Sequence, residues 1–425
     1  MTKSTKAVFF SDEPVPEERE RGPSVVAIVC RGVSRFAKWV VVLGTLVIFS
    51  AAFVAGRQIR IQTLEKACQT GVDAGDWATV RQAATQLRFW QPSKASPVIF
   101  LAEAANQQGR LEQAVSLLRQ LPDDDPMTPP ALLECSHLLF GPLNRPLDAA
   151  EVLERALRCD PSMREARRRL IYFYAFTLQR RKMVEHAYAA IEHGSDMPET
   201  YVYLFSQDYL SFANAYDENS RWLEGNPDEE IFLVARAIYR IVSMALDETE
   251  DTSKVPVDEA TGIPMHKRQV ADYFKRFPNN IELLAYFLRE ASTNGDAAEV
   301  ARLLSTAPSA AADDNRFWRY MGWLHRNNEE WLDAERCYQK ALQINPYDYV
   351  TQHQLAAVGR RLNRPEYVET LEPLAREGQN LRRELLQLPN VTSVPLPLLN
   401  RMAIHAAACG DKVVAGRLYE RTKKK

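Results

Sequence analysis

Proline recurs along this chain at a regular interval of about 34 residues. Six prolines set the pattern: Pro92, Pro126, Pro161, Pro227, Pro278 and Pro346. The first three are each one period apart, and Pro161 and Pro227 are separated by two periods. Two periods also separate Pro278 from Pro346. A period of this length is typical of a solenoid in which each repeat is a pair of helices packed on its neighbours.

One interval does not follow the period. Pro227 and Pro278 are separated by one and a half periods rather than by a whole number of them. The surplus coincides with a polar stretch that contains several acidic residues, Pro256 and Gly262. Because such a stretch breaks helices, we predict an inserted loop over 247–265 within this repeat.

The unit from Asn315 to Pro346 has the clearest pattern of two amphipathic helices. In chain order its signature residues are Trp318, Met321, Gly322, Ala334, Tyr338, Ala341 and Pro346. They resemble the W-L-G-A-Y-A-P signature of the tetratricopeptide repeat, with His325 where tyrosine is usual. Small residues there let two helices approach closely, and large ones fill the gap to the next hairpin. The resemblance implies an all-α, right-handed solenoid of helical hairpins.

The other units are in register but match the signature less well, least of all in the first unit and over 196–227. Glycines at four positions, Gly75, Gly109, Gly295 and Gly410, fall between the two helices of a unit, where glycine supplies a positive φ. We predict repeats over 61–227, an interrupted repeat over 228–278, repeats over 279–380, a connector over 381–395 and a C-terminal partial repeat with a basic tail over 396–425.

An apolar run without charge or proline, from Trp39 to Gly56, precedes the repeats. As a helix the run covers about 27 Å, close to the hydrocarbon thickness of a bilayer. Together with Phe36 and Ala37 the run predicts one transmembrane helix over 36–56, kept as a signal anchor. The segment 1–35 is expected to be a disordered cytoplasmic tail. The chain is thus predicted to be a membrane-anchored tetratricopeptide repeat protein.

Basic residues on the two sides of this span predict its orientation. Four precede it and three follow it: Arg21, Arg31, Arg35 and Lys38, then Arg57, Arg60 and Lys66. The excess favours a cytoplasmic N-terminus, with the repeats on the far side of the membrane in a periplasm or lumen. Two alternatives stay open. The run could be a buried core helix, or a signal peptide cleaved near Ala52 that would release a secreted or periplasmic adaptor.

The composition and the motif search exclude several classes of function. Lys and Arg number 53 and Asp and Glu 55, so the net charge of −2 provides no broad positive field for nucleic acid. Six cysteines without a C-x-x-C pair and seven scattered histidines match no disulfide framework or metal motif. No nucleophile-elbow, Walker or dinucleotide-binding motif occurs. We therefore predict no enzymatic activity, no cofactor, no metal site and no nucleic-acid partner.

The resemblance also implies a binding surface, because the first helix of each tetratricopeptide hairpin lines a concave groove. Reading the register gives a basic patch made of Arg289, Arg316, Arg319, Trp323, Arg326, His353 and Arg360. Guanidinium groups bind carboxylates bidentately, so the basic patch predicts an acidic protein or peptide partner. In the alternative interpretation these arginines only pair with nearby glutamates such as Glu329, Glu330 and Glu335.

These features together predict a membrane-tethered scaffold or adaptor. It would bind protein segments on its concave surface and promote the assembly of complexes near the membrane, where tethering raises the effective concentration. A second possibility is a signalling regulator in which the repeats form a sensor domain. The segment before the span is, however, too short for a DNA-binding or catalytic module.

Overall fold

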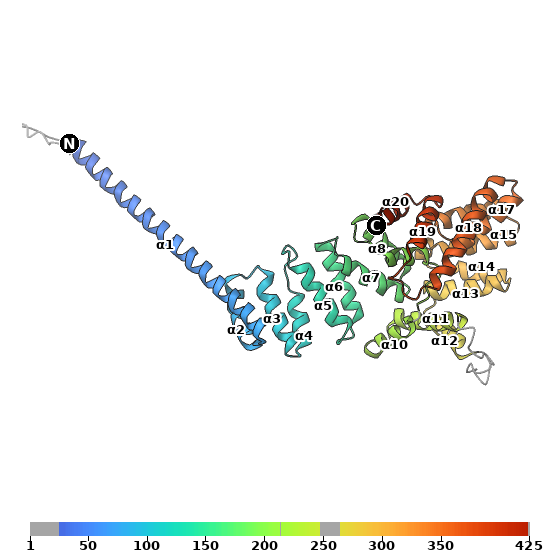
Figure 1. The fold of residues 1–425 in the computed structure, drawn as a ribbon, viewed down its shortest axis with the longest axis horizontal. Coiled ribbons are helices and arrows are strands. Elements are labelled where there is room, and N and C mark those ends of the chain that lie inside the picture. Colours follow the sequence, from blue (N-terminus) through green and yellow to red (C-terminus); the bar gives the residue numbers. More distant parts are fainter. Residues whose placement is uncertain (1–24, 213, 247–263, 424–425) are drawn as a thin grey trace, which may run out of the picture. The chain divides into compact units, whose positions relative to one another are not determined.

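The computed structural model describes residues 25–212, 214–246 and 264–423. Within these ranges the chain consists of helices joined by turns and loops (Figure 1). The first ten are α1 Val25–Ala74, α2 Trp77–Trp90, α3 Ala95–Gln107, α4 Leu111–Leu118, α5 Thr128–Phe140, α6 Pro146–Cys159, α7 Arg164–Phe176, α8 Arg180–Glu192, α9 Pro198–Phe205 and α10 Ala215–Gly225. The others are α11 Glu230–Leu246, α12 Met265–Arg276, α13 Ile281–Thr293, α14 Ala297–Ser305, α15 Asn315–Asn327, α16 Trp331–Ile344, α17 Tyr349–Arg361, α18 Pro365–Leu386, α19 Leu396–Ala408 and α20 Lys412–Lys423. The predicted all-α solenoid of hairpins is confirmed.

Two predicted boundaries differ from these elements. Helix α1 begins at Val25, so residues 25–35 belong to the helix and not to a tail. Helix α18 continues to Leu386, so the connector is shorter than the predicted 381–395. The predicted tail before residue 25 lies outside the described residues, as does the inserted loop 247–265 except for its last two positions.

The chain divides into two compact units, Met1–Trp90 and Gln91–Lys425. In the first unit, the part of α1 from Trp39 to Ala74 is long and apolar enough to cross a membrane, with a mean hydropathy of 2.3 in its best window. None of that window is buried. A core helix of a soluble protein would bury most of such a window, so the structure does not favour the buried-helix alternative.

Helix α2 packs antiparallel against the last turns of α1 and completes the first hairpin. Ile61 and Leu64 of α1 and Val80 and Leu87 of α2 are buried between the two helices. Gly71 allows this approach, because a Cβ atom at that position would lie only 2.7 Å from a methyl carbon of Val80. The first hairpin thus also has a small residue, Gly71, where its two helices approach closely, as the repeat signature predicts.

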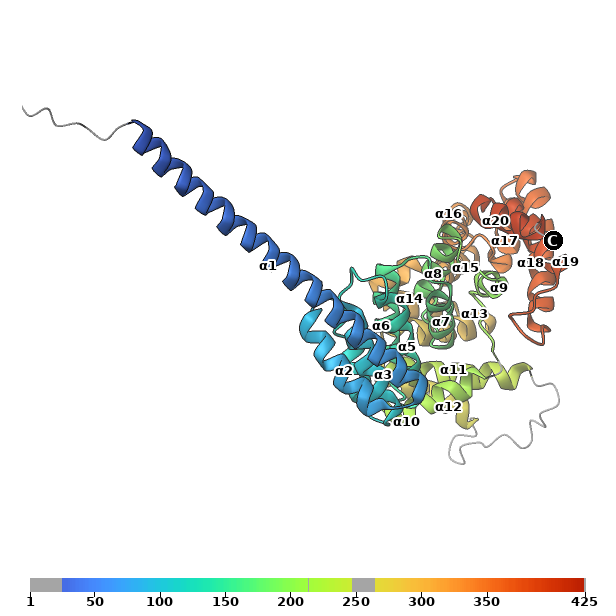
Figure 2. The ribbon, with the colours of Figure 1, turned by 60° about the vertical axis from the view of Figure 1, so that its left-hand side comes forward.

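The second unit, α3–α20, consists mainly of antiparallel pairs that stack in chain order (Figures 1 and 2). Glycine takes a positive φ in the turns of α3–α4, α13–α14 and α19–α20, at Gly109, Gly295 and Gly410. In four other hairpins a larger residue takes this conformation, at Asn144, Leu178, Glu329 and Asn363. These hairpins thus share one turn geometry even where the sequence has no glycine.

The two helices of the hairpin α15–α16 also approach closely at a glycine. A Cβ atom added to Gly322 would lie 2.7 Å from the ring of Tyr338, and that ring is fully buried. The pair Gly322 and Tyr338 thus packs as the repeat signature requires.

Replacing Gly322 with alanine is expected to lower the free energy of unfolding by about 1–3 kcal/mol, because the new Cβ atom would overlap the fully buried ring of Tyr338. Urea denaturation followed by circular dichroism measures the change. Gly416→Ala in α20 is the matched control, since a Cβ atom there meets nothing within 4 Å. The control is expected to be neutral or slightly stabilising. Equal effects of the two substitutions would contradict the close packing.

The region 196–229 departs from the hairpin pattern. Helix α9 has only 8 residues and packs on α7 and α8, whereas α10 packs on α11 and α7. Between the two helices, residues 206–212 form a turn followed by a stretch without regular structure, and we call them the inner segment. The rings of Trp222 and Phe232 lie 5.4 Å apart and both contact Phe173, so aromatic packing replaces the repeat interface here.

The last hairpin closes back onto the middle of the chain. Helix α20 packs beside α8, although they are far apart in sequence (Figure 1). The fully buried carboxylate of Asp196, just after α8, accepts hydrogen bonds from Arg417 at 2.7 Å and from Arg421 at 2.6 Å. Asp411 accepts hydrogen bonds from Tyr188 at 2.6 Å and from Tyr347 at 2.7 Å. The C-terminal hairpin is therefore an integral part of the second unit.

Candidate functional site

The inner segment lies against the helices that carry the predicted basic patch. Its Asp208 carboxylate accepts hydrogen bonds from Arg319 at 2.8 Å, Asn315 at 2.8 Å and Asn345 at 3.1 Å. The next residue, Tyr209, packs under the guanidinium of Arg382, 4.1 Å from the ring centre. A segment of the protein itself thus occupies the place predicted for an acidic partner.

Arg316 and Arg319 are buried, which corrects the prediction that they are exposed in the groove. Only 7% and 8% of their side chains is accessible. Arg319 also pairs with Asp348 at 2.7 Å, and Arg316 pairs with Glu282 and Asp314, both at 2.6 Å. These carboxylates explain why the arginines can be buried. Three of the four belong to other hairpins or to the inner segment, so the repeat register could not predict them.

Arg180 joins the same network through Glu282, at 3.1 Å. We call these seven residues the ion-pair cluster: Arg180, Asp208, Glu282, Asp314, Arg316, Arg319 and Asp348. It holds three guanidinium groups and four carboxylates, so the acids are in excess.

This excess affects the protonation of the cluster. Burial, reinforced by the charge of Asp208, raises the pKa of Asp348 despite the attraction of Arg319. Burial acts in the same direction on Asp314, but the charge and hydrogen bonds of Arg316 outweigh it and lower the pKa of that carboxyl. Burial disfavours the charge of Arg316 and Arg319, but the carboxylates outweigh it and raise the pKa of both. Both arginines are therefore fully charged and internally neutralised.

The other residues of the basic patch lie nearer the surface. Arg289 is about half exposed and packs on Tyr286, while Trp323 is partly buried against the α13–α15 core. Arg326 donates to Gln354, and Arg360 pairs with Glu372. The remaining member, His353, is exposed. The seven predicted residues therefore do not form one continuous exposed surface.

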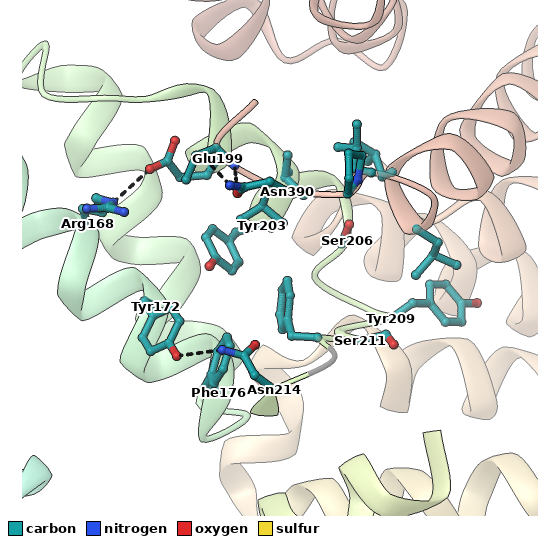
Figure 3. Close-up of a pocket in the computed structure, with 18 of the residues that line it drawn as sticks. Arg168, Tyr172, Phe176, Glu199, Tyr203, Ser206, Tyr209, Ser211, Asn214 and Asn390 are labelled. Carbon is teal, nitrogen blue, oxygen red and sulfur yellow. Dashed lines mark hydrogen bonds and ion pairs between the residues drawn. The ribbon is translucent and has the colours of Figure 1, made fainter. Parts of the chain in front are cut away.

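A cavity in the second unit is lined in part by the inner segment. It has a volume of about 1060 Å³ and is formed by α7, α9, the inner segment, α11, the end of α18 and the connector 388–392 (Figure 3). Six aromatic rings line it: Tyr172, Phe176, Tyr203, Tyr209, Phe212 and Tyr239. We call it the aromatic cavity.

Three of the six rings stack on one another. The rings of Tyr172 and Phe176 stack at 3.9 Å, and the ring of Phe212 stacks on Phe176 at 5.3 Å. Burial raises the pKa of Tyr172 and Tyr203, so both hydroxyls stay neutral hydrogen-bonding groups. A stacked, neutral aromatic wall is suited to apolar and amphipathic side chains.

Polar groups lie around the edge of the aromatic cavity. Arg168 donates to Glu199 at 3.1 Å and pairs with Glu165 at 3.2 Å (Figure 3). Asn390, in the connector, and Arg169 complete this edge. Positive and negative charges are therefore balanced, and the cavity has no strong preference for an acidic ligand.

A smaller cavity of about 200 Å³ adjoins the aromatic cavity and shares Tyr209, Ser211, Val242 and Leu386 with it. Three residues of the predicted basic patch line it, Arg289, Arg316 and Arg319, but the last two are neutralised by the ion-pair cluster. Sequence analysis missed the aromatic cavity because the inner segment and the connector carry no repeat signature.

One group of described side chains has metal-ligand geometry. His325, Glu330 and Asp333 place their ligand atoms within 4.8 Å of one another in the α15–α16 turn. Each already has a partner, since His325 pairs with Glu330 at 2.5 Å and Asp333 pairs with Arg336. Surface pairs explain this group, and we assign no metal to it.

The stacked hairpins place this protein in the class of helical-repeat proteins. The sequence model of the tetratricopeptide repeat matches residues 316–348, the unit that resembled this repeat most. The predicted tetratricopeptide repeat is therefore confirmed for this unit of the chain. No curated protein matches the sequence.

Solved structures that match this chain share little of its sequence. A tetratricopeptide repeat protein from Parabacteroides merdae is 13% identical over 70% of this chain and 98% of its own, with a TM-score of 0.27. Yeast Tom70 is 12% identical over 86% of this chain and 92% of its own, with a TM-score of 0.27. Human IFIT1, a dimer with m7Gppp-AAAA, is 14% identical over 84% and 75%, with a TM-score of 0.28. At these TM-scores the likeness carries no functional argument.

Proposed function

We propose that this protein is a membrane-tethered adaptor that binds an extended segment of another protein in the aromatic cavity. The observation that carries the proposal is the aromatic cavity itself, about 1060 Å³ in volume and lined by six rings from four separate parts of the second unit. Tetratricopeptide scaffolds act by binding, and a preformed apolar cavity with a polar edge is the form that such binding sites take.

The chemistry of the cavity favours a partner segment with apolar or aromatic side chains. Stacked rings offer contact area at little cost in conformational entropy, and the tyrosine hydroxyls and Asn390 supply hydrogen bonds to a peptide backbone. The acidic partner predicted from the sequence is less favoured, because Asp208 and Asp348 already neutralise Arg319.

Helix α1 is proposed as the tether. Its exposed apolar surface over 39–56 matches the thickness of a bilayer, and the basic residues before it favour an N-terminus in the cytoplasm. The repeats would then act in a periplasm or lumen. A single-pass anchor restricts the search for partners to the membrane surface, which raises their effective concentration.

Partner capture by full-length protein tests this proposal. Thr392→Trp adds a large ring at an exposed position that lines the aromatic cavity, and it should obstruct the cavity without unfolding the chain. Thr370→Trp is the matched control, because Thr370 is also exposed, on α18, but lines neither cavity. Crosslinked partners are purified from native membranes and quantified by mass spectrometry.

A partner of the aromatic cavity is expected to fall at least tenfold with Thr392→Trp and to be unchanged with Thr370→Trp. Capture of the same proteins in the same amounts by both variants and by the parent protein would show that this cavity is not the binding site.

A further inference from the structure

The end of the first hairpin lies immediately beside the apolar span. Arg57, the first residue after the span, donates from Nη2 to the backbone carbonyl oxygen of Trp90 at 2.7 Å. One turn later, Arg60 donates to the side chain of Gln86 at 2.6 Å. Because α1 is one continuous helix, these bonds hold the C-terminal end of α2 at the level where the span ends. We call Arg57, Arg60, Arg88, Phe89 and Trp90 the basic tip.

The basic tip carries a net positive charge. The two facing segments, 57–64 and 83–90, contain three arginines and no aspartate or glutamate. The remainder of the hairpin is different, with acidic residues at Glu65, Asp73 and Asp76 farther from the span. The positive charge is thus concentrated at the end that points toward the span, where phosphate groups of a bilayer would lie.

The basic tip also exposes apolar surface beyond the span. The Phe89 side chain is 79% exposed and makes an edge-on contact with the Trp90 ring, with centroids 5.6 Å apart. On the adjacent turn of α1, Ile59 is 64% exposed. At the other end of the span Trp39 is 68% exposed, about 27 Å away along the helix. Aromatic residues therefore mark both ends of the span, as at the two interfaces of a bilayer.

We infer that the basic tip binds the membrane surface, with Phe89 inserted at the level of the lipid headgroups and the three arginines on anionic phosphates. This inference rests on the proposed function, because it requires α1 to span the membrane. It adds a second contact, which would fix the first hairpin against the bilayer rather than leave it free to pivot on a single helix. The partner is the surface of a bilayer that contains anionic phospholipid.

Photocrosslinking of the full-length protein in vesicles tests the inference. The photoreactive residue p-benzoylphenylalanine replaces Phe89, Phe49 or Leu332 in three separate variants. Phe49 lies inside the span and Leu332 on α16, and their side chains are 75% and 56% exposed, respectively. The vesicles contain phosphatidylcholine alone or with about one third phosphatidylglycerol. Lipid adducts are counted by intact mass, and circular dichroism confirms that each variant is folded.

We expect lipid adducts at positions 49 and 89, at least fivefold more than at position 332, and more at position 89 when phosphatidylglycerol is present. Arg88→Gln in the position-89 variant is expected to reduce that adduct about two- to fivefold, since each cation near an anionic surface contributes to binding. Adducts at position 49 but not at position 89 would overturn the inference and leave the tether intact. No adduct at either position would overturn the tether itself. An adduct yield at position 89 that is the same with and without phosphatidylglycerol would exclude binding to anionic phosphates.

Discussion

Replacing Arg319 with alanine is expected to lower the free energy of unfolding by about 3–5 kcal/mol. Arg319 is the cation shared by Asp208 and Asp348, at 2.8 Å and 2.7 Å, and at most 5% of either carboxylate side chain is exposed. Without the guanidinium, two buried carboxylates face each other unpaired. The pKa of Asp348 is already raised, so its protonation should relieve part of this cost, and the loss should be smaller at pH 5 than at pH 7.

Urea denaturation of the full-length protein in detergent measures this loss. Arg289→Ala is the matched control, since Arg289 lines the same small cavity but is 48% exposed. Its change should stay within about 1 kcal/mol. Similar values for the two variants would mean that Arg319 is solvated and that the basic patch is a free surface, as the register alone predicted.

Replacing Asp196 with alanine is expected to cost about 3–4 kcal/mol and to detach the C-terminal hairpin. Its buried carboxylate accepts hydrogen bonds from Arg417, Arg421 and Tyr201, and bonds to a charged group contribute more than neutral ones. Limited proteolysis between α19 and α20 reports the detachment, and thermal denaturation reports the loss of stability. Glu420→Ala removes only a 63% exposed partner of Arg417 and should change little.

The same contact predicts a dependence on pH in the unmodified protein. Burial would raise the pKa of Asp196, but the hydrogen bonds from Arg421, Tyr201 and Arg417 outweigh it and lower that pKa. A carboxyl group with a lowered pKa stabilises the fold above its ordinary titration range, near pH 4, and this contribution is lost as the pH falls through the folded value. Protease cleavage of the hairpin should therefore increase in acid. Equal cleavage of parent and Asp196→Ala proteins at pH 7 would contradict this role of Asp196.

The structure also explains why the functional surface could be predicted only in part. The register correctly places Arg316 and Arg319 on the first helix of their hairpin, and it indicates carboxylates as their partners. It cannot indicate that Asp208, more than a hundred residues earlier, supplies one of those carboxylates. The aromatic cavity likewise combines Tyr172, Tyr203 and Asn390, which no periodic pattern relates to one another.

The local architecture of this protein follows from short-range patterns in its sequence. Each hairpin depends on contacts between residues within a single repeat, such as Gly322 with Tyr338, so the proline period and the signature residues were sufficient to predict it. Which faces of the hairpins remain exposed depends instead on contacts between distant parts of the chain. The inner segment enters the groove and α20 returns to α8 through pairs such as Asp196 with Arg417, separated by more than two hundred residues. Such pairs depend on the curvature that accumulates over many repeats, and a pattern within one repeat does not predict that curvature.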